Sequence, residues 1–388
     1  MRLQLILPQV KASEVAVPEV CPHRGCRGRH FRLRQRVRKP LRDTVYREVL
    51  VDRYQCLGCG RSFRVYPLGV SRDQISLRVK GLGVMLYLLG LSYGAASLAL
   101  EALGVYMCKS RVYDAVQETA ERVPGLERRA VFGGGHTSAL GSDVTTVKCG
   151  GRWLPIGVTV DAVSGLVLTV DPLPGEDAET LKAWLEPIAK AVGAELLVSD
   201  DADGFKTVAD ELALGHQVCK SHVKRNTLAM TEQLKGRAAK DEDGSLAAIE
   251  VRGERAVADL ERLEQLIQSR RPQDVGELEE MHLRYVRAAP PRQGESASLA
   301  YRLRLLFLDR WNLWARLTRY RSWRGSQGET IDGSNNACER GIGWWIKERY
   351  RTMRGYKRPR SALNVSRLLA WCGNYLERGG ADLASLMA

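Results

Sequence analysis

The residues that could do chemistry in this chain are three acids, Asp143, Asp200 and Glu339, which lie far apart in the sequence. Asp143 lies in a predicted strand, and Asp200 directly follows another. Two carboxylates about 4 Å apart repel each other by roughly 4 kcal/mol at an effective dielectric constant near 20, and a divalent cation removes this cost. Mg²⁺ prefers carboxylates together with phosphate oxygens. If folding brings the three acids together, they could hold two such ions for in-line attack on a phosphodiester.

Other interpretations of these acids stay open at this point. The aspartates could serve only as caps or turn residues at strand ends, and Glu339 could pair with a neighbouring arginine on a solvated helix. Asp201 and Asp203 follow Asp200 closely, so either could be the second ligand if the strand ends later. Asp161, at the end of another predicted strand, is an outside candidate.

The segments around the two aspartates have the order of an α/β domain. Their predicted ranges are 139–148, 152–161, 165–171, 177–192, 194–199, 204–214 and 217–219. Read by periodicity they are three strands, a helix, a buried strand, a helix and a fifth strand. Three antiparallel strands followed by alternating helices and strands is the order of a ribonuclease-H-like core, a mixed five-stranded sheet with helices. In that order Asp143 and Asp200 are neighbours, and open α/β sheets place ligands at the carboxyl ends of their strands.

Glu339 lies early in a predicted helix whose continuation is strongly basic. Ser334, Asn335 and Asn336 are good helix starters, and tyrosines are interleaved with the cations of 347–360. One acid at the start of a cationic, aromatic helix indicates a carboxylate working beside nucleic acid. We expect phosphate contacts from this stretch. The residues concerned are Arg340, Lys347, Arg349, Arg351, Arg354, Lys357 and Arg358.

Residues 224–330 form a predicted α-helical insertion between the fifth strand and the Glu339 helix. The ranges 247–269 and 298–320 are helical by periodicity. Trp311 and Trp314 share one apolar stripe of the second range, so we expect them in a core and not stacked on bases. The sequence assigns no chemistry to this insertion, which could hold a DNA end or a second protomer.

Four cysteines near the N-terminus form two close pairs about thirty residues apart. They are Cys21, Cys26, Cys56 and Cys59. Paired thiolates on tight turns supply a tetrahedral sulfur site that suits structural Zn²⁺. His23 or His30 could replace one cysteine, and four unrelated buried thiols are the alternative interpretation. A strand is predicted over 44–54, leading into the second pair.

Charge concentrates in this zinc ribbon. The chain carries a net charge of +14, and Cys21 to Arg64 holds thirteen Lys/Arg against three Asp/Glu. A polyanionic partner is therefore favoured, and we expect Arg24, Arg27 and Arg29 to contact phosphates.

The apolar stretch Gly81 to Leu100 has no charged residue and is long enough to span a membrane. Its glycines divide it into two short pieces, so we predict two buried helices and no membrane partner. Gly104 ends the second helix, and a third begins near Ser110. This pattern predicts a helix-turn-helix in which Lys109 and Arg111 face DNA, with a plain three-helix module as the alternative. Nine cysteines, an odd number, and no signal peptide favour a reducing cytoplasm.

Ordered motifs across most of the chain resemble the DDE-superfamily transposases of bacterial insertion sequences, in the Mutator-like branch. The matching stretches are Gly141-Ser-Asp143-Val-Thr, Val198-Ser-Asp200-Asp-Ala-Asp-Gly-Phe, Gln217-Val-Cys219-Lys-Ser-His222, Asn335-Asn-Ala-Cys-Glu339-Arg and Arg354-Gly-Tyr. The resemblance implies a zinc ribbon over 1–70, a helix-turn-helix over 71–130, a catalytic core over 131–223 and 331–388, and the helical insertion over 224–330.

The resemblance also implies a function. Asp143, Asp200 and Glu339 would be the catalytic, metal-binding triad for two Mg²⁺, which Mn²⁺ can replace. Cys219 and His222 match the family's Cys-x-x-His element, as structural support near the site or as a metal site, and Asp201 is a further supporting residue. Such enzymes bind double-stranded DNA at terminal inverted repeats and at a target, act as homodimers on paired ends, and work at the nucleoid. Competing functions are a ribonuclease-H-like nuclease or resolvase, and a non-catalytic repressor.

Overall fold

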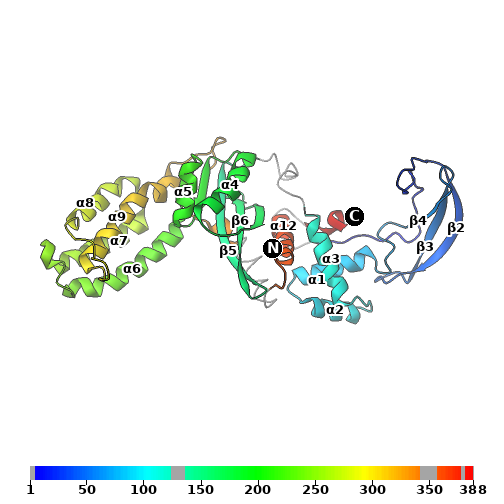
Figure 1. Ribbon diagram of the computed structural model, residues 1–388, viewed down its shortest axis with the longest axis horizontal. Helices are drawn as coiled ribbons and strands as arrows, with labels where there is room; N and C mark the ends of the chain where they lie inside the picture. Colours follow the sequence, from blue (N-terminus) through cyan, green and yellow to red (C-terminus); the bar gives the residue numbers. More distant parts are fainter. Residues whose placement is uncertain (1–4, 124–135, 341–355, 377–380, 388) are drawn as a thin grey trace. The chain divides into compact units, whose positions relative to one another are not determined.

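The computed structural model describes residues 5–123, 136–340, 356–376 and 381–387 (Figure 1). Within these residues the chain divides into two compact units. The first comprises Met1–Arg128, Thr146–Leu154 and Gly341–Ala388, and the second comprises Arg129–Thr145 and Pro155–Arg340.

A three-stranded antiparallel sheet forms the ribbon of the first unit. Its strands are β2 (Phe31–Pro40), β3 (Glu48–Cys56) and β4 (Ser62–Val65), in the order β2-β3-β4. The predicted strand 44–54 overlaps β3, whereas β2 was not predicted. β2 is an exposed edge strand in which Phe31, Leu33 and Val37 alternate with arginines, so a period-2 strand signal was present in the sequence.

Three helices follow the ribbon: α1 (Leu77–Leu88), α2 (Tyr93–Ala102) and α3 (Lys109–Glu121). Ser76 and Ser92 cap the first two, each accepting a hydrogen bond from the backbone N–H three residues on. Gly104, with φ of +77°, follows α2. The predicted helices are confirmed, and none of the helices in the described ranges has the length and apolarity that a membrane span requires.

The C-terminal elements belong to the first unit. They are α12 (Pro359–Leu376), β10 (Ala381–Asp382), which pairs in parallel with β1 (Leu5–Ile6), and α13 (Leu383–Met387). Asn364 of α12 donates to Gln117 of α3 at 3.1 Å, and Arg360 pairs with Glu121 at 2.8 Å. α12 packs against α3 within this unit. The expected catalytic core over 131–223 and 331–388 stays a prediction.

The second unit is built on a five-stranded sheet in the order β7-β6-β5-β8-β9. Its elements in chain order are β5 (Ala139–Cys149), β6 (Arg152–Asp161), β7 (Val167–Pro172), α4 (Ala178–Val192), β8 (Leu196–Ser199), α5 (Asp203–Glu211) and β9 (Gly215–Val218). β6 and β7 are antiparallel, whereas β8 pairs in parallel with both β5 and β9. This mixed sheet confirms the predicted ribonuclease-H-like fold.

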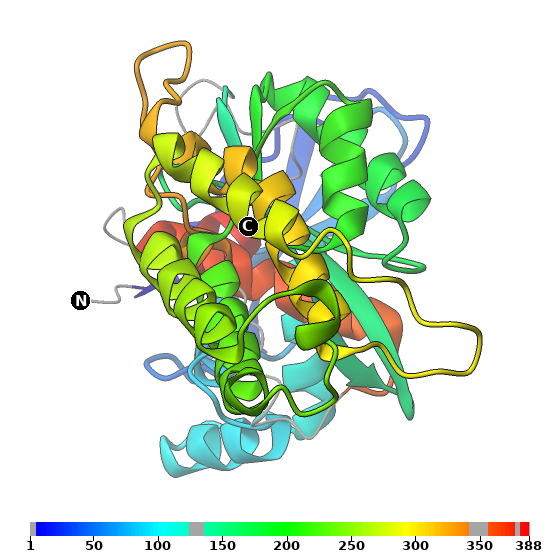
Figure 2. The same cartoon turned by 90° about the vertical axis from the view of Figure 1, so that its left-hand side faces the viewer.

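The helical insertion begins inside a single long helix, since α6 (Lys220–Lys240) starts at the end of β9 and runs out of the core. It continues with α7 (Gly253–Ser269), α8 (Val275–Arg284) and α9 (Leu299–Thr318), and with single 3₁₀ turns at Ala247–Ile249, Pro272–Asp274 and Arg319–Arg321. The four helices lie side by side in Figure 2 around a common apolar core. Trp314 is fully buried in this core, and Trp311 is partly buried and packs against the same core, as predicted.

Candidate active site

Two predicted acids lie on adjacent strands of the core sheet. In the parallel pair β5–β8, Leu140 is opposite Leu197 and Gly141 is opposite Val198. The pairing ends at Gly141–Val198; continued for two more residues, it would bring Asp143 opposite Asp200, which directly follows β8. Because residues opposite each other in a sheet share a face, the two carboxylates would then leave the sheet on the same side.

Asn335, the residue that precedes the helix of Glu339, connects this helix to β5. α10 (Asn336–Arg340) starts after Asn335, whose buried side chain donates from Nδ2 to the carbonyl of Ser142 at 2.9 Å. Ser142 is the neighbour of Asp143 in β5. The Glu339 N–H donates to the carbonyl of Asn335 at 2.9 Å, which closes the first turn.

The packing here is tight enough to require a glycine and a buried thiol. A Cβ at Gly141 would lie 2.6 Å from Val160 and 3.3 Å from the Asn335 amide oxygen, so no larger residue fits. Cys338 is fully buried and donates to the carbonyl of Val158 at 3.5 Å. Burial raises the pKa of the Cys338 thiol, and the negative charges of Asp143 and Glu339 raise it further. The thiol therefore lies near both carboxylates.

Cys219 and His222 lie beside Glu339. Cys219 precedes α6, and its buried Sγ accepts the Asn335 N–H at 3.2 Å and lies 4.0 Å from Glu339 Oε1. One turn later His222 places Nε2 3.5 Å from the same oxygen. These three residues form a group of potential metal ligands within 4.8 Å of one another. In the described part of the chain, Asp143, Asp200 and Glu339 do not form so close a group.

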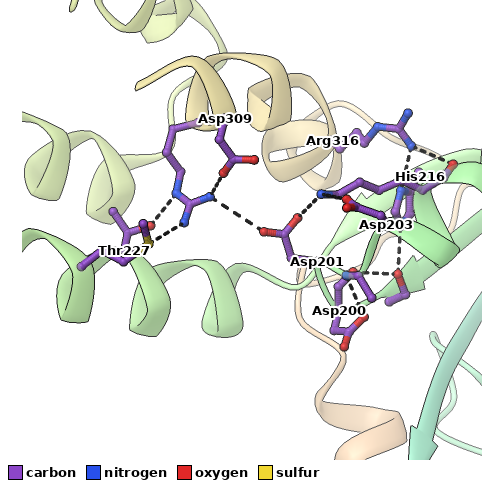
Figure 3. A network of polar contacts seen from close by, with 12 residues as sticks. Asp200, Asp201, Asp203, His216, Thr227, Asp309 and Arg316 are labelled. Atoms are coloured by element: carbon purple, nitrogen blue, oxygen red, sulfur yellow. Dashed lines mark hydrogen bonds and ion pairs between the residues drawn. The ribbon is translucent and has the colours of Figure 1, made fainter. Parts of the chain in front are cut away.

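Asp201 and Asp203 are occupied by cations of the protein itself. Figure 3 shows the Asp201 carboxylate between two basic groups: Lys206 at 2.9 Å and the guanidinium of Arg310 at 3.8 Å. Asp203 also binds Lys206, at 3.0 Å. Asp200 pairs with neither of these cations within the described ranges, and its Oδ1 accepts the N–H of Ala202 at 3.1 Å.

Arg310 comes from α9 of the insertion, and its guanidinium is almost completely buried, with 4% of the side chain exposed. Its Nε donates to Thr227 of α6 at 2.8 Å, and it also contacts Asp309. A buried cation needs such partners because its desolvation is costly. Arg310 therefore ties the loop after β8 to two helices of the insertion.

A second chain of hydrogen bonds fixes the end of β8. Arg316 of α9 binds Asp210 with two hydrogen bonds and donates to His216 Nδ1 at 2.9 Å. His216 Nε2 therefore carries the proton and donates to Ser199 Oγ at 2.9 Å, and Ser199 donates to the carbonyl of Asp200 at 2.9 Å. Burial lowers the pKa of His216 to about 3, and the Arg316 cation acts in the same direction.

The buried side chain of Gln217 makes a similar set of hydrogen bonds near the segment that leads to Glu339. Its Oε1 accepts the Tyr320 N–H at 2.7 Å, and its Nε2 donates to the carbonyl of Leu317 at 3.1 Å. Lys220 donates its N–H to the carbonyl of Gly333 at 2.9 Å, which anchors the loop before Asn335. Sequence reasoning missed the positioning residues His216, Arg310 and Arg316. The available signal was that Arg310 falls at helical spacing on the apolar stripe predicted for 298–320, three residues after Phe307 and four before Trp314.

The predicted outside candidate, Asp161, is a turn residue. It accepts hydrogen bonds from the Val163 N–H at 2.9 Å and from the Ser164 hydroxyl at 2.6 Å in the β6–β7 hairpin. This is the Asx-turn role that was left open for the aspartates.

The four N-terminal cysteines come together in the ribbon, with Sγ–Sγ distances of 3.8 Å for Cys21–Cys59 and for Cys26–Cys56. A tetrahedron with Zn–S bonds of about 2.3 Å has edges of about 3.8 Å, so the arrangement fits a zinc ion. The backbone N–H groups of Cys59 and Gly58 lower the pKa of Cys56 to about 7, which favours the thiolate. A Cβ at Gly28 would lie 2.7 Å from the Cys56 sulfur, so this position needs glycine.

The predicted nucleic-acid-binding residues differ in how accessible they are. Exposed side chains are Arg24, Arg27, Arg29, Lys109, Arg340, Lys357 and Arg358. Arg111 is instead engaged by Asp73 and by Asp114, so its guanidinium faces acids of its own unit. Lys357 and Arg358 precede α12. Lys347, Arg349, Arg351 and Arg354 lie outside the described residues.

Comparisons with known proteins carry no argument about the fold or the activity of this chain. No family model and no curated protein sequence matches the chain. Among solved structures, the HTLV-2 integrase catalytic core domain in complex with magnesium is 20% identical, over 32% of this chain and 82% of that one, with a TM-score of 0.19. The BIV integrase catalytic core domain is 15% identical, over 50% and 90% of the two chains, with the same TM-score. At these values the likeness carries no argument about activity.

Proposed function

We propose that this protein is a DNA transposase of the DDE type, with Asp143, Asp200 and Glu339 as its catalytic acids. The observation that carries the proposal is the convergence of three distant segments on one edge of the sheet. The β5–β8 pairing ends two residues before the aspartates and, if continued, would align them, and the Asn335–Ser142 hydrogen bond ties the start of the Glu339 helix to the neighbour of Asp143; both support the proposal. Asp201 and Asp203 are committed to Lys206, which favours Asp200 as the second acid.

Asp143, Asp200 and Glu339 would hold a pair of Mg²⁺ ions, with Mn²⁺ as a substitute, because carboxylate oxygens are the ligands that hard divalent cations prefer. When bound, the ions would lower the pKa of water or of a 3′-hydroxyl and offset negative charge on the phosphodiester. The chain's own contribution is to hold the acids in place. Arg310 and Arg316 fix the loop of Asp200, and Gln217 fixes the loop before Glu339.

Cys219 and His222 are positioning residues in this proposal. Cys219 accepts the N–H of Asn335 and so orients the start of the Glu339 helix, while His222 restricts the carboxylate from one side. Their distances to Glu339 Oε1, 4.0 and 3.5 Å, support contact with the acid itself.

DNA recognition is assigned to the first unit. The ribbon, with structural Zn²⁺ on its four cysteines, and the helices α1–α3 would bind the inverted repeats of the element, as two protomers on paired ends. The exposed cations Arg24, Arg27, Arg29 and Lys109 support phosphate contacts there.

The test is to incubate the protein with DNA carrying the ends of its element and Mg²⁺ or Mn²⁺, with Asp143→Ala beside the wild type. Metal-dependent cleavage and joining that the variant loses would establish the transposase. Nicking without any joined product would indicate a nuclease or resolvase. Tight binding with no strand chemistry in either protein would indicate a repressor.

A further inference from the structure

The pairing register of the ribbon sheet separates its charges onto two faces. Residues directly opposite each other on antiparallel strands share a face. Gln35, Arg53 and Arg64 are mutual partners across β2, β3 and β4, and Arg32, Gln55 and Ser62 form the next row on the same side. We call these six residues the arginine face.

The arginine face carries three cations and no acid. Arg32, Arg53 and Arg64 are exposed, and none has an ion pair or hydrogen bond within the described part of the chain. Arg53 and Arg64 are direct cross-strand partners. Like charges in that position are destabilising, so the pair is favourable only when an anion lies against it.

The opposite face of the same sheet is neutralised. There Arg36 pairs with Asp52 at 3.3 Å, and Arg38 pairs with Glu48 at 2.8 Å. The aromatic residues of the sheet also lie on that side, where Phe63 contacts both Phe31 and Tyr54. The two faces therefore differ in both charge and aromatic content.

We propose that the arginine face binds the phosphate backbone of duplex DNA, as a surface additional to the cysteine loops and to α3. The inference deepens the proposed function by naming where the ribbon contacts its partner. Arginine, glutamine and serine are phosphate-binding side chains that carry no base specificity. A single strand would be bound by aromatic stacking, and a membrane surface by exposed apolar residues, and this face offers neither.

The experiment measures binding of the full-length protein to a short random-sequence DNA duplex by fluorescence anisotropy across a series of KCl concentrations. Each lost phosphate contact lowers the log–log salt slope by about 0.9. The double variant R53Q/R64Q should therefore lose about 1.8 from the slope, which is about a 12-fold smaller fall in affinity between about 50 and 200 mM salt.

Two variants control for charge and folding. Arg38→Gln removes one arginine from the opposite face, where Glu48 already neutralises it, and should keep the wild-type slope. R53K/R64K keeps the charges and should restore most of the slope, which a folding defect would not allow.

A wild-type slope in R53Q/R64Q would overturn the proposal. A dependence on Arg53 and Arg64 that is seen with single strands but not with the duplex would overturn the assignment of the partner. Cleavage that does not need Asp143 would overturn the proposed function and leave this surface standing. Asp143-dependent cleavage with an unchanged slope in R53Q/R64Q would do the reverse.

Discussion

The ribonuclease-H-like core and the ribbon use their cations in opposite ways. In the core, Lys206, Arg310 and Arg316 are bound to acids around the Asp200 loop. On the ribbon, Arg53 and Arg64 face each other without an acid between them. The difference shows that the net charge of +14 is not equally available to a polyanion. Cations that are paired with acids hold the loop after β8, while exposed and unpaired cations can contact phosphate.

Removal of zinc should have the largest effect, because it should unfold the ribbon and leave the ribonuclease-H-like core folded. Structural zinc contributes on the order of 10 kcal/mol to the folding of a small domain, whereas the core is held by its own packing. We expect a chelator, or Cys56→Ser, to unfold the ribbon and weaken DNA binding while the urea transition of the core stays unchanged. Circular dichroism and anisotropy on the same samples check this, and unchanged DNA binding would count against the zinc ribbon.

Glu339→Gln removes a carboxylate that the proposed function assigns to catalysis and not to DNA binding. We expect DNA cleavage to fall by at least roughly 10³-fold, the upper end of the cost of one preorganised electrostatic group. DNA binding should stay as in the wild type, because the phosphate contacts are assigned to the first unit. A gel assay for cleavage and an anisotropy assay for binding separate the two effects. Parallel loss of binding would show that Glu339 has another role.

Arg310→Met removes the cation of a buried ion pair. Asp201 keeps Lys206 at 2.9 Å, so the loss should stay below the roughly 3 kcal/mol of an uncompensated buried charge and appear as a lower urea midpoint of the core. The double variant R310M/D201N removes both charges and should recover part of that loss, giving a coupling energy in a double-mutant cycle. Additive losses would mean that Asp201 and Arg310 do not act as a pair.

The neutral His216 makes the core sensitive to pH. Its pKa is about 3 in the folded protein against 6.5 when unfolded, so between these values the unfolded state binds the extra proton. Its contribution is therefore fully present above pH 6.5 and is lost as the pH falls. Linkage gives about 2 kcal/mol less stability at pH 5 than at pH 8 from this group. Urea midpoints at both pH values check this, and His216→Gln should flatten the difference.

Arg64→Gln should have the smallest effect, and it tests most specifically whether the arginines of the ribbon are unpaired. Because Arg64 lies opposite Arg53 without an acid, its removal should stabilise the DNA-free ribbon by about 0.5 kcal/mol or less. This sign is opposite to that expected for Arg310→Met. Thermal melting at low and high salt checks it, since salt screens the repulsion and should remove the gain. Destabilisation at low salt would show that Arg64 has an internal partner.

Local patterns in the sequence predicted most of the core. The alternation in 139–148 and 152–161, the helical periodicity of 177–192 and 298–320, and the apolar run ending at Ser199 depend on neighbouring residues, and the structure has strands and helices there. The alternation of Phe31, Leu33 and Val37 with arginines is a further local strand signal, which the prediction did not use. The packing of α12 against α3 could not be predicted, because an amphipathic helix does not encode which apolar surface will cover it.

The sequence by itself determined which residues are available for chemistry: three distant acids, four paired cysteines and an excess of arginine. Only the tertiary structure decided their use. It paired Gly141 with Val198, two residues before Asp143 and Asp200, committed Asp201 to Lys206 and Arg310, and left Arg53 opposite Arg64. The physical reason is that charge and side-chain type are local properties. Pairing and burial, which decide whether a charge is neutralised or exposed, depend on residues far away in the chain.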